Sequence, residues 1–216
     1  MDDEQPFGRE RSPDGSSIRL PHMLTRQMAA GRKPRAVVLV EGSSDKAALD
    51  ALASRAGRDL QSEGISIVSI GGATSVGHFL DLLGPRGIDV PLAGLCDAAE
   101  EGEFRRGAER SGLGSSLTRA DMELLGFYVC VADLEDELIR AVGIPAVERV
   151  VHGQGELGSF RTFQKQLEWQ GRHTEEQLRR FMGTRSGRKI RYARLLVDAL
   201  DLAHVPRPLD RLLAHV

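Results

Sequence analysis

Four short apolar runs constrain the fold of this chain more than any other feature of its sequence. They cover residues 36–40, 65–70, 90–95 and 127–131. The runs largely lack an apolar–polar alternation, so each is predicted to be a strand that is covered on both faces. Helical patterns at 45–56, 75–83 and 133–142 lie between and after them. This alternation of strands and helices predicts an α/β fold with a central parallel sheet of about four strands, flanked by helices.

The remainder of the chain is predicted to lie outside that sheet. Residues 1–34 are rich in Gly, Ser, Pro and charge, which is typical of a flexible tail, with one short helix near 22–30. Residues 98–120 hold four glycines and are predicted to be a long loop. From residue 145 the pattern is helical, with a capping box at 174–177 and helices at 174–181, 187–202 and 209–214. The predicted organisation is a tail at 1–34, an α/β domain at 35–142 and a helical extension packed on it at 143–216.

Composition and charge exclude several classes of protein. A hydrophobic content of 41% in 216 residues is enough to bury a core, which argues against wholesale disorder. The 29 basic and 31 acidic residues nearly balance, but acids punctuate 41–137 while Arg and Lys crowd 172–194. Cys96 and Cys130 lie in apolar runs and are predicted to be reduced core thiols. No apolar run reaches the length of a membrane span, and a cytoplasmic protein is expected.

Three of the four predicted strands end in a carboxylate: Glu41, Asp97 and Asp133. Each residue alone is equally typical of a loop or of a helix cap. The carboxyl ends of parallel strands meet at one edge of a sheet, however, and carboxylates within roughly 4–6 Å of one another repel unless a cation lies between them. Oxygen ligands suit Mg²⁺ or Mn²⁺, and no cluster of His or Cys offers the softer ligands of zinc. We therefore expect a divalent-metal site at this edge.

These residues carry a resemblance to a known family. The run Val-Glu-Gly-Ser-Ser-Asp at 40–45, the strand that ends in Asp97 and the later Asp-Leu-Glu at 133–135 resemble the Toprim domain. Topoisomerases, bacterial primases and the overcoming-lysogenization-defect (OLD) nucleases share this domain, and the acidic run at 133–139 looks most like the OLD-type branch. The resemblance covers about 35–142 and implies a Rossmann-like Toprim fold. The helical remainder is similar to small standalone Toprim proteins of bacteria.

The resemblance also implies roles for individual residues. Glu41 matches the glutamate of the family that acts as a metal ligand or as a general acid and base, and Asp97 matches the first aspartate of an Asp-x-Asp motif. Both are therefore candidate catalytic residues. The candidate metal ligands are Glu41, Asp45, Asp97, Asp133 and Glu135.

The chain departs from the family pattern at one position. The second aspartate of Asp-x-Asp is Ala99 here. Glu100, Glu101 and Glu103 are candidates to replace it, and the sequence does not choose among them. The departure affects one metal position and, through it, catalysis.

Basic residues near the start of the predicted helix at 187–202 complete the candidate site. OLD-type nucleases use a basic residue after the acidic motifs to stabilise charge on phosphate, and Lys189 is the candidate for this catalytic role. The predicted nucleic-acid contacts are Arg185, Arg188, Lys189 and Arg191. A solvated helix terminus explains the same residues equally well. Three aromatic residues at helical spacings are predicted to lie in the core: Phe160, Phe163 and Trp169.

Three functions follow from the sequence. The first is metal-dependent hydrolysis of phosphodiester bonds by a DNA endonuclease or nickase that uses one or two Mg²⁺ or Mn²⁺ ions. The second, favoured by Ala99, is a catalytically degraded Toprim module that binds nucleic acid or a partner protein. The third, a nucleotidyl transferase such as a primase, lacks the companion segments of that class. No Gly-x-x-x-x-Gly-Lys-Ser/Thr loop is present, so the chain is predicted to have no ATPase of its own. Whether an ATPase partner acts in trans and whether the chain forms a homodimer stay open at the level of the sequence.

Overall fold

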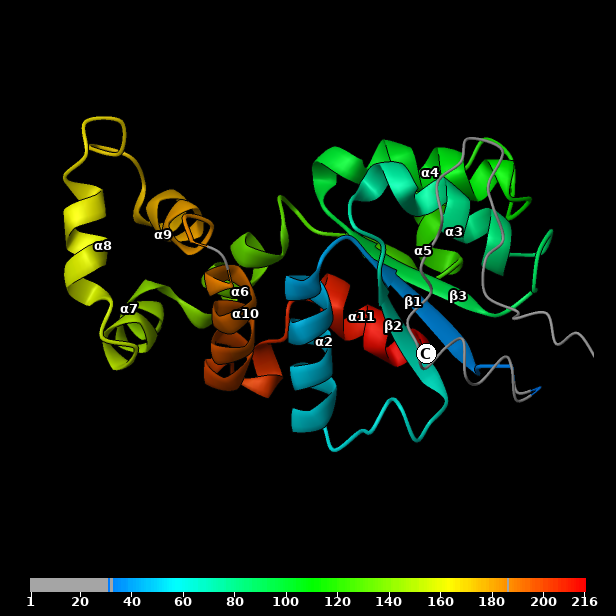
Figure 1. Ribbon diagram of the computed structural model, residues 1–216, viewed down its shortest axis with the longest axis horizontal. Coiled ribbons are helices and arrows are strands. Elements are labelled where there is room, and N and C mark those ends of the chain that lie inside the picture. The colour runs from blue at the N-terminus through cyan, green and yellow to red at the C-terminus, as the bar shows by residue number, and fades with distance from the viewer. Residues whose placement is uncertain (1–30, 32, 186) are drawn as a thin grey trace, which may run out of the picture.

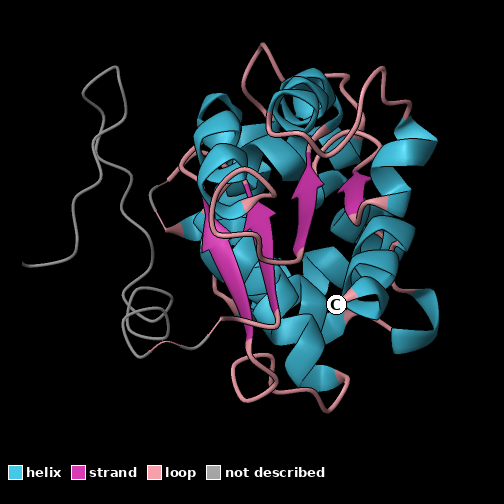
Figure 2. Ribbon diagram, turned by 90° about the vertical axis from the view of Figure 1, so that its right-hand side faces the viewer, coloured by secondary structure: helices cyan, strands magenta, loops and turns pink. Residues whose placement is uncertain are grey.

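The computed structural model describes residues 31, 33–185 and 187–216, and the helix predicted near 22–30 lies outside them. Its centre is a four-stranded parallel sheet in the order β2-β1-β3-β4 (Figures 1 and 2). The strands are β1 (Ala36–Val40), β2 (Ile65–Ser69), β3 (Leu92–Cys96) and β4 (Phe127–Val129). Val40 pairs with Ser69 on one side and with Leu95 on the other. The predicted α/β fold with its parallel sheet is confirmed.

Both faces of the sheet are covered, which explains why the strand residues do not alternate. Val38 and Val40 of β1 belong to one apolar cluster and Val37 and Leu39 to another. Helix α2 (Ser43–Arg55) packs on the first face, and α3 (Val76–Leu83), α4 (Glu101–Arg110) and α5 (Arg119–Leu124) cover the second (Figure 1). Short 3-10 turns at Ala73–Ser75, Ala98–Glu100 and Leu202–His204 complete the connections.

The C-terminal helices share a core with the sheet. They are α6 (Leu134–Val142), α7 (Ile144–Gly153), α8 (Leu157–Gln164), α9 (Thr174–Met182), α10 (Arg188–Ala199) and α11 (Arg207–His215). Helix α10 lies along α2, and α11 lies against β3 and β4 (Figure 1). One continuous apolar cluster contains β1, α2 and residues of all six of these helices. No helix in the described part of the chain combines the length and apolarity that crossing a membrane would need.

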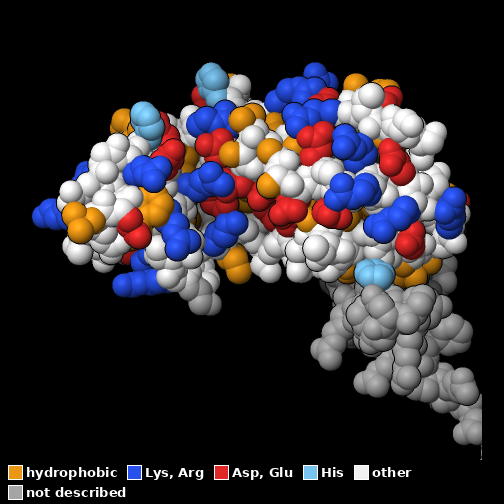
Figure 3. Space-filling view, turned by 90° about the horizontal axis from the view of Figure 1, so that it is seen from above, with side chains coloured by type: hydrophobic (Ala, Val, Ile, Leu, Met, Phe, Trp, Pro, Cys, Tyr) orange, Lys and Arg blue, Asp and Glu red, His pale blue; other side chains and the backbone are white. Residues whose placement is uncertain are grey.

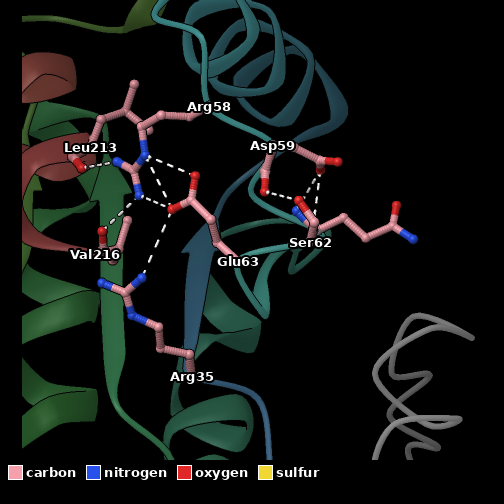
Figure 4. Close-up of polar contacts among 8 residues, drawn as sticks. Arg35, Arg58, Asp59, Ser62, Glu63, Leu213 and Val216 are labelled. Atoms are coloured by element: carbon pink, nitrogen blue, oxygen red, sulfur yellow. Dashed lines mark hydrogen bonds and ion pairs between the residues drawn. The ribbon is translucent and has the colours of Figure 1, made fainter.

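An arginine clamp, formed by Arg58 with Glu63 and Arg35, fixes the end of α11 to the amino-terminal end of the sheet (Figure 4). Arg58 donates hydrogen bonds to the main-chain oxygens of Leu213 and Val216 and to the carboxylate of Glu63. Arg35 lies 3.9 Å from the same carboxylate. Every charged group of this clamp therefore has a partner of opposite charge or a carbonyl oxygen.

Residues 98–120 are not the loop that their glycines predict. A 3-10 turn, α4 and α5 occupy most of this segment. Phe104 and Ala108 are buried and anchor α4 on α3. Gly107 lies at this contact, where an added Cβ would come within 2.9 Å of Leu80, so this glycine allows two helices to approach rather than ending one.

The predicted capping box at 174–177 is also wrong. Helix α9 has His173 at its N-cap position, with no side-chain capping bond. Gln177 is turned inward, where it donates a hydrogen bond to the carbonyl oxygen of Trp169 and accepts one from Gln164. Gln177 therefore joins α9 to α8 and to the connection between them and does not cap α9.

Candidate metal centre

The candidate site begins where β1 and β3 end. The backbone N–H of Asp97 donates a hydrogen bond to Oε1 of Glu41 over 2.8 Å, which ties the two strand ends together. The backbone N–H groups of Gly71 and Gly72 donate to the carbonyl oxygen of Glu41. Both glycines have positive φ angles, of 75° and 117°, that favour glycine, so the chain leaving β2 folds closely over the end of β1.

Asp45 reaches the same edge from the first turn of α2. Its Oδ2 accepts a hydrogen bond of 2.7 Å from the backbone N–H of Gly42, and the residue is buried. The Gly42 turn therefore places the carboxylates of Glu41 and Asp45 at the same end of the sheet.

Asp133 and Glu135 come from the start of α6 and face two cations. Asp133 caps α6 by accepting from the backbone N–H of Asp136, and its other oxygen lies 2.5 Å from Nε of Arg179. Glu135 is 2% exposed, and Nζ of Lys189 lies 3.0 Å from its Oε2. Both carboxylate oxygens of Glu135 are buried without a hydrogen bond in the described structure, and only Oε2 has the ion-pair contact with Lys189. A buried carboxylate oxygen without a hydrogen-bond donor is energetically costly, which makes Glu135 a candidate ligand.

Burial and neighbouring charges shift the pKa values of these carboxyl groups. Burial, followed by the charges of Glu41, Asp133 and Asp45, raises the pKa of Asp97 to about 7. Burial also raises the pKa of Glu41, of Asp45 and of Glu135, in each case with a contribution from a neighbouring carboxylate. Burial works against the charged form of Lys189, but Glu135, Asp45 and Asp133 together raise its pKa. Each of the five candidate metal ligands is thus electrostatically coupled to at least one of the others and to Lys189.

The donor chemistry of this edge fits a hard divalent cation, although the side chains do not enclose one as they stand. Across the described ranges, no group of three or more Asp, Glu, His or Cys side chains is arranged so that it could hold a metal ion. The set nevertheless consists of carboxylates, the ligands that Mg²⁺ and Mn²⁺ prefer, and it includes the unpartnered oxygen of Glu135. Lys189 and Arg179 supply part of the positive charge that an ion would bring.

A basic cavity adjoins the acidic edge. Its volume is about 510 Å³, and it lies between the start of α6 and helices α9 and α10. The lining residues are Asp133, Glu135, Trp169, Arg172, Glu176, Arg179, Arg180, Gly183 and Lys189. A view onto this side shows acidic side chains across the middle of the molecule with Lys and Arg side chains beside them (Figure 3). Acidic ligands next to cations are what a metal site that acts on a polyanion needs.

The structure leaves three of the four predicted basic residues exposed and buries the fourth, Arg188. Lys189 faces the acidic edge, and Arg185 is exposed beside a second cavity of about 540 Å³ along α8 and α9. Arg191 is half exposed and pairs with Glu156. Arg188 differs from the expectation, because it is only 3% exposed and its guanidinium is held by Glu156, Thr184 and the carbonyl oxygen of Phe181. Arg188 is therefore part of the core of the extension and leaves the set of nucleic-acid contacts.

Sequence reasoning missed two features of the cavity. Arg179 is the ion-pair partner of Asp133, 46 positions away in the chain, and nothing local in the sequence signals the pair. Trp169 stacks on Phe163 with ring centroids 5.1 Å apart, but its other side lines the cavity. Phe160 and Phe163 are buried, as predicted.

The parallel sheet with helices on both faces and acids at its carboxyl edge defines an α/β protein. Residues 34–98 match the family model described as overcoming lysogenization defect protein-like, TOPRIM domain. This segment is therefore similar to an OLD-like Toprim domain, as its motifs predict. A comparison with curated proteins finds no match.

Solved structures extend this likeness beyond the matched segment. The C-terminal region of the Burkholderia pseudomallei OLD protein is similar with a TM-score of 0.65 and 20% identity, over 84% of this chain and 96% of that one. Two structures of the C-terminal region of the Xanthomonas campestris pv. campestris OLD protein have TM-scores of 0.65 and 0.63 and identities of 24% and 26%. They cover 84% of this chain and 91% and 93% of their own. Toprim domains generally bind divalent metal ions, and the OLD-type domain is consistent with a nucleic-acid-related hydrolase.

Proposed function

We propose that this protein is a divalent-metal-dependent nuclease that cuts DNA, as an endonuclease or nickase. One observation carries the proposal: carboxylates from four separate segments converge at one edge of the sheet, directly beside a cavity lined by four cations. The acids are suited to hold Mg²⁺ or Mn²⁺, and the cations are suited to hold the phosphates of a nucleic acid.

The roles of the residues follow from their contacts. Glu41, Asp45, Asp97, Asp133 and Glu135 would hold one or two ions, which when bound supply Lewis-acid chemistry and lower the pKa of water. Lys189 now compensates Glu135, and Arg179 compensates Asp133. With an ion held by these carboxylates, Lys189 and Arg179 would be able to turn toward phosphate. In that position Lys189 stabilises charge that develops on the phosphoryl oxygens.

The nucleic acid would cross the cavity toward the extension. Arg172, Arg180 and Arg185 are exposed along this path, and Arg191 lies farther along α10. Each phosphate neutralised by such a side chain adds affinity that falls with salt. As further proposals we retain an ATPase that acts in trans, a homodimer and a cytoplasmic location.

Plasmid nicking tests the activity. Supercoiled plasmid is incubated with Mn²⁺ or Mg²⁺ and with wild-type protein, Glu41→Gln, Asp97→Asn or the control Glu103→Gln. Glu103 is an acid nearby on α4 that is already paired with Arg106. We expect the first two variants to lose at least about 100-fold in nicking rate, because each removes a carboxylate that would hold the metal ion and so would position it to stabilise charge in the transition state. The control is expected to keep its rate. Equal nicking by wild type and all variants would refute the assignment.

A second function is favoured by the replacement of the family's second aspartate by Ala99. A Toprim module that has lost a metal position would bind DNA without cutting it. Salt-sensitive DNA binding with no cleavage in Mg²⁺, Mn²⁺ or Ca²⁺ is the outcome that this alternative predicts.

A further inference from the structure

The cavity beside the acidic edge has an aromatic wall that the proposed metal chemistry does not use. Trp169, in the connection between α8 and α9, lines this cavity (Figure 1). Phe163 covers one side of the indole, with the ring planes at 27° and the ring centroids 5.1 Å apart. Phe163 is not among the described residues that line the cavity, so the indole meets the cavity on a side that Phe163 leaves uncovered.

Hydrogen bonds fix the indole in this place. The backbone N–H of Trp169 donates to the carbonyl oxygen of Gln166 over 2.9 Å, and the buried side chain of Gln177 donates to the carbonyl oxygen of Trp169 over 2.7 Å. The indole Nε1–H donates to Oε1 of Glu168 over 2.7 Å. Because the polar atom of the indole already has a partner, the side toward the cavity is an apolar aromatic surface that is positioned before any ligand binds.

The cations around this wall differ in how far their charge is compensated. Arg179 and Lys189 face carboxylates of the acidic edge at 2.5 and 3.0 Å. Arg172 is exposed, and its ion pair with the exposed Glu176 spans 4.0 Å. Arg180 is exposed as well, and it forms no ion pair within the described part of the chain. Arg172 and Arg180 are therefore the cations of the cavity that are most available to an anionic ligand.

An aromatic surface beside available cations suits single-stranded nucleic acid. Proteins that bind such strands combine a positively charged groove, which follows the backbone, with aromatic side chains on which bases stack. In a duplex the neighbouring base pairs cover the faces of each base, so a side chain stacks only on an unpaired base. The cavity volume of about 510 Å³ lies within the range of roughly 300–1,000 Å³ that is typical of small-ligand sites, which is large enough for one nucleotide.

We propose that Trp169 stacks on the base of an unpaired nucleotide, while Arg172 and Arg180 hold the adjacent phosphates. Asp133 and Glu135 line the same cavity, so a nucleotide that is stacked there lies beside the acidic edge. The proposal rests on the proposed function, because it takes nucleic acid as the ligand, and it deepens that function by naming the substrate class. The substrate is a single strand, or a duplex that contains an unpaired segment.

Intrinsic fluorescence tests the stacking directly, because Trp169 is the one tryptophan of the chain. The full chain is titrated, in EDTA and in Ca²⁺, with single-stranded oligothymidine, with an abasic strand of equal length and with a duplex. We expect oligothymidine to quench the fluorescence, because a base in contact with the indole does so, and the other two ligands to leave it nearly unchanged. Quenching by the abasic strand as strong as that by oligothymidine, or no quenching by oligothymidine in either buffer, would overturn the stacking role. Equal quenching by the duplex would overturn the preference for an unpaired base.

Fluorescence anisotropy of labelled strands compares the variants. Trp169→Ala is expected to weaken binding of oligothymidine at least about fivefold, as loss of one stacked base does, and to leave binding of the abasic strand within about twofold. Trp169→Phe should recover most of the affinity, because it keeps an aromatic ring. Leu167→Ala is the matched control: Leu167 lies in the same connection, is 90% exposed and is not among the described residues that line the cavity. Its affinity should stay within about twofold of wild type.

The pattern across the two strands separates stacking from a purely structural role. If Trp169 only packed the α8–α9 connection, its replacement would weaken binding of both strands equally, and that result would refute the proposal. Arg180→Ala should weaken binding of both strands alike, because it removes a phosphate contact and no stacking surface. If Trp169→Ala does not fold, the titration of wild type with the two strands still decides the question.

The outcomes also separate this proposal from the proposed function. If wild type nicks plasmid in Mn²⁺ but oligothymidine does not quench its fluorescence, only the stacking role is overturned. If oligothymidine quenches the fluorescence and the abasic strand does not, but the protein cleaves nothing in Mg²⁺ or Mn²⁺, the nuclease assignment fails. The stacking site is then supported as part of a module that binds single strands without cutting them.

Discussion

Two clusters of acidic and basic side chains lie at opposite ends of the sheet, and they differ in how completely their charges are compensated. In the clamp at the amino-terminal end of the sheet, an oxygen of Glu63 lies 2.6 Å from a guanidinium nitrogen of Arg58. Arg58 also donates hydrogen bonds to the main-chain oxygens of Leu213 and Val216 (Figure 4). The hydrogen bond from Arg58 lowers the pKa of Glu63. At the carboxyl edge, burial and neighbouring acids raise the pKa of Asp97 to about 7.

The difference separates stability from function. In the clamp Arg58 holds the end of α11 in place, and Glu63 pairs with Arg58. At the carboxyl edge burial and neighbouring acids raise the pKa values of Glu41, Asp45 and Asp97, and carboxyl groups perturbed in this way are typical of functional sites. Removing one charge should therefore have opposite effects on the free energy of unfolding at the two ends.

The largest expected change is at the clamp. Arg58→Ala removes the hydrogen bonds to Leu213 and Val216 and should lower the free energy of unfolding by about 3 kcal/mol, since hydrogen bonds to charged groups contribute most. Urea denaturation in EDTA measures it. Arg35→Ala is the matched control, because Arg35 is 63% exposed and 3.9 Å from Glu63, and its effect should stay within about 0.5 kcal/mol. Equal losses in both variants would contradict the importance of the clamp.

Metal should stabilise the protein through the carboxyl edge alone. At a concentration of 100 times its dissociation constant, Mn²⁺ should raise the free energy of unfolding by about 2.7 kcal/mol. Thermal denaturation with and without Mn²⁺ measures this, and Arg58→Ala should keep the full increment while Asp97→Asn loses most of it. An increment that survives in Asp97→Asn would place the metal elsewhere.

Asp97→Asn should stabilise the metal-free protein in a defined pH window. The raised pKa of Asp97 means that the folded state holds a proton between pH 4 and 7 that the unfolded state has released, so stability falls as pH rises through that window. At about 1.4 kcal/mol per unit, wild type should be at least about 2 kcal/mol less stable than Asp97→Asn at pH 8, and equal to it near pH 4. Urea titrations at both pH values decide this, and an equal difference at pH 4 and 8 would exclude titration of Asp97 as the cause.

The smallest expected effect concerns the exposed arginine outside both clusters. Arg185→Ala should weaken DNA binding about two- to fivefold and reduce the salt slope by about one, as expected for one lost phosphate contact. Fluorescence anisotropy at several salt concentrations measures both quantities. An unchanged salt slope would remove Arg185 from the DNA path.

Much of the fold could be predicted because its signals are local. An unalternated apolar run is a strong sign of a covered strand, and β1 lies where the sequence places it. The convergence of Glu41 and Asp97 follows from the parallel sheet, which brings strand ends to one edge. Helix α4 was missed because glycines and charged residues obscure its buried positions, Phe104 and Ala108.

The parts of the site that could not be predicted depend on contacts between distant residues. The pairing of Asp133 with Arg179 joins positions whose separation gives no sequence signal. The burial of Arg188 depends on Glu156 and on the ring of Phe181, which lies 4.1 Å below its guanidinium.

The packing of α10 along α2 limits how far this site can be reduced. Arg55, in the last turn of α2, donates to the carbonyl oxygens of Val197 and Leu200 at the end of α10. Asp45 lies in the first turn of α2, and Lys189 lies in the first turn of α10. The two helices therefore run side by side in the same direction. A protein shortened to residues 34–98, the segment that matches the family model, would lose Lys189 and would expose the apolar side of α2 to water. Transplanting these acids into another scaffold would require both helices as one unit.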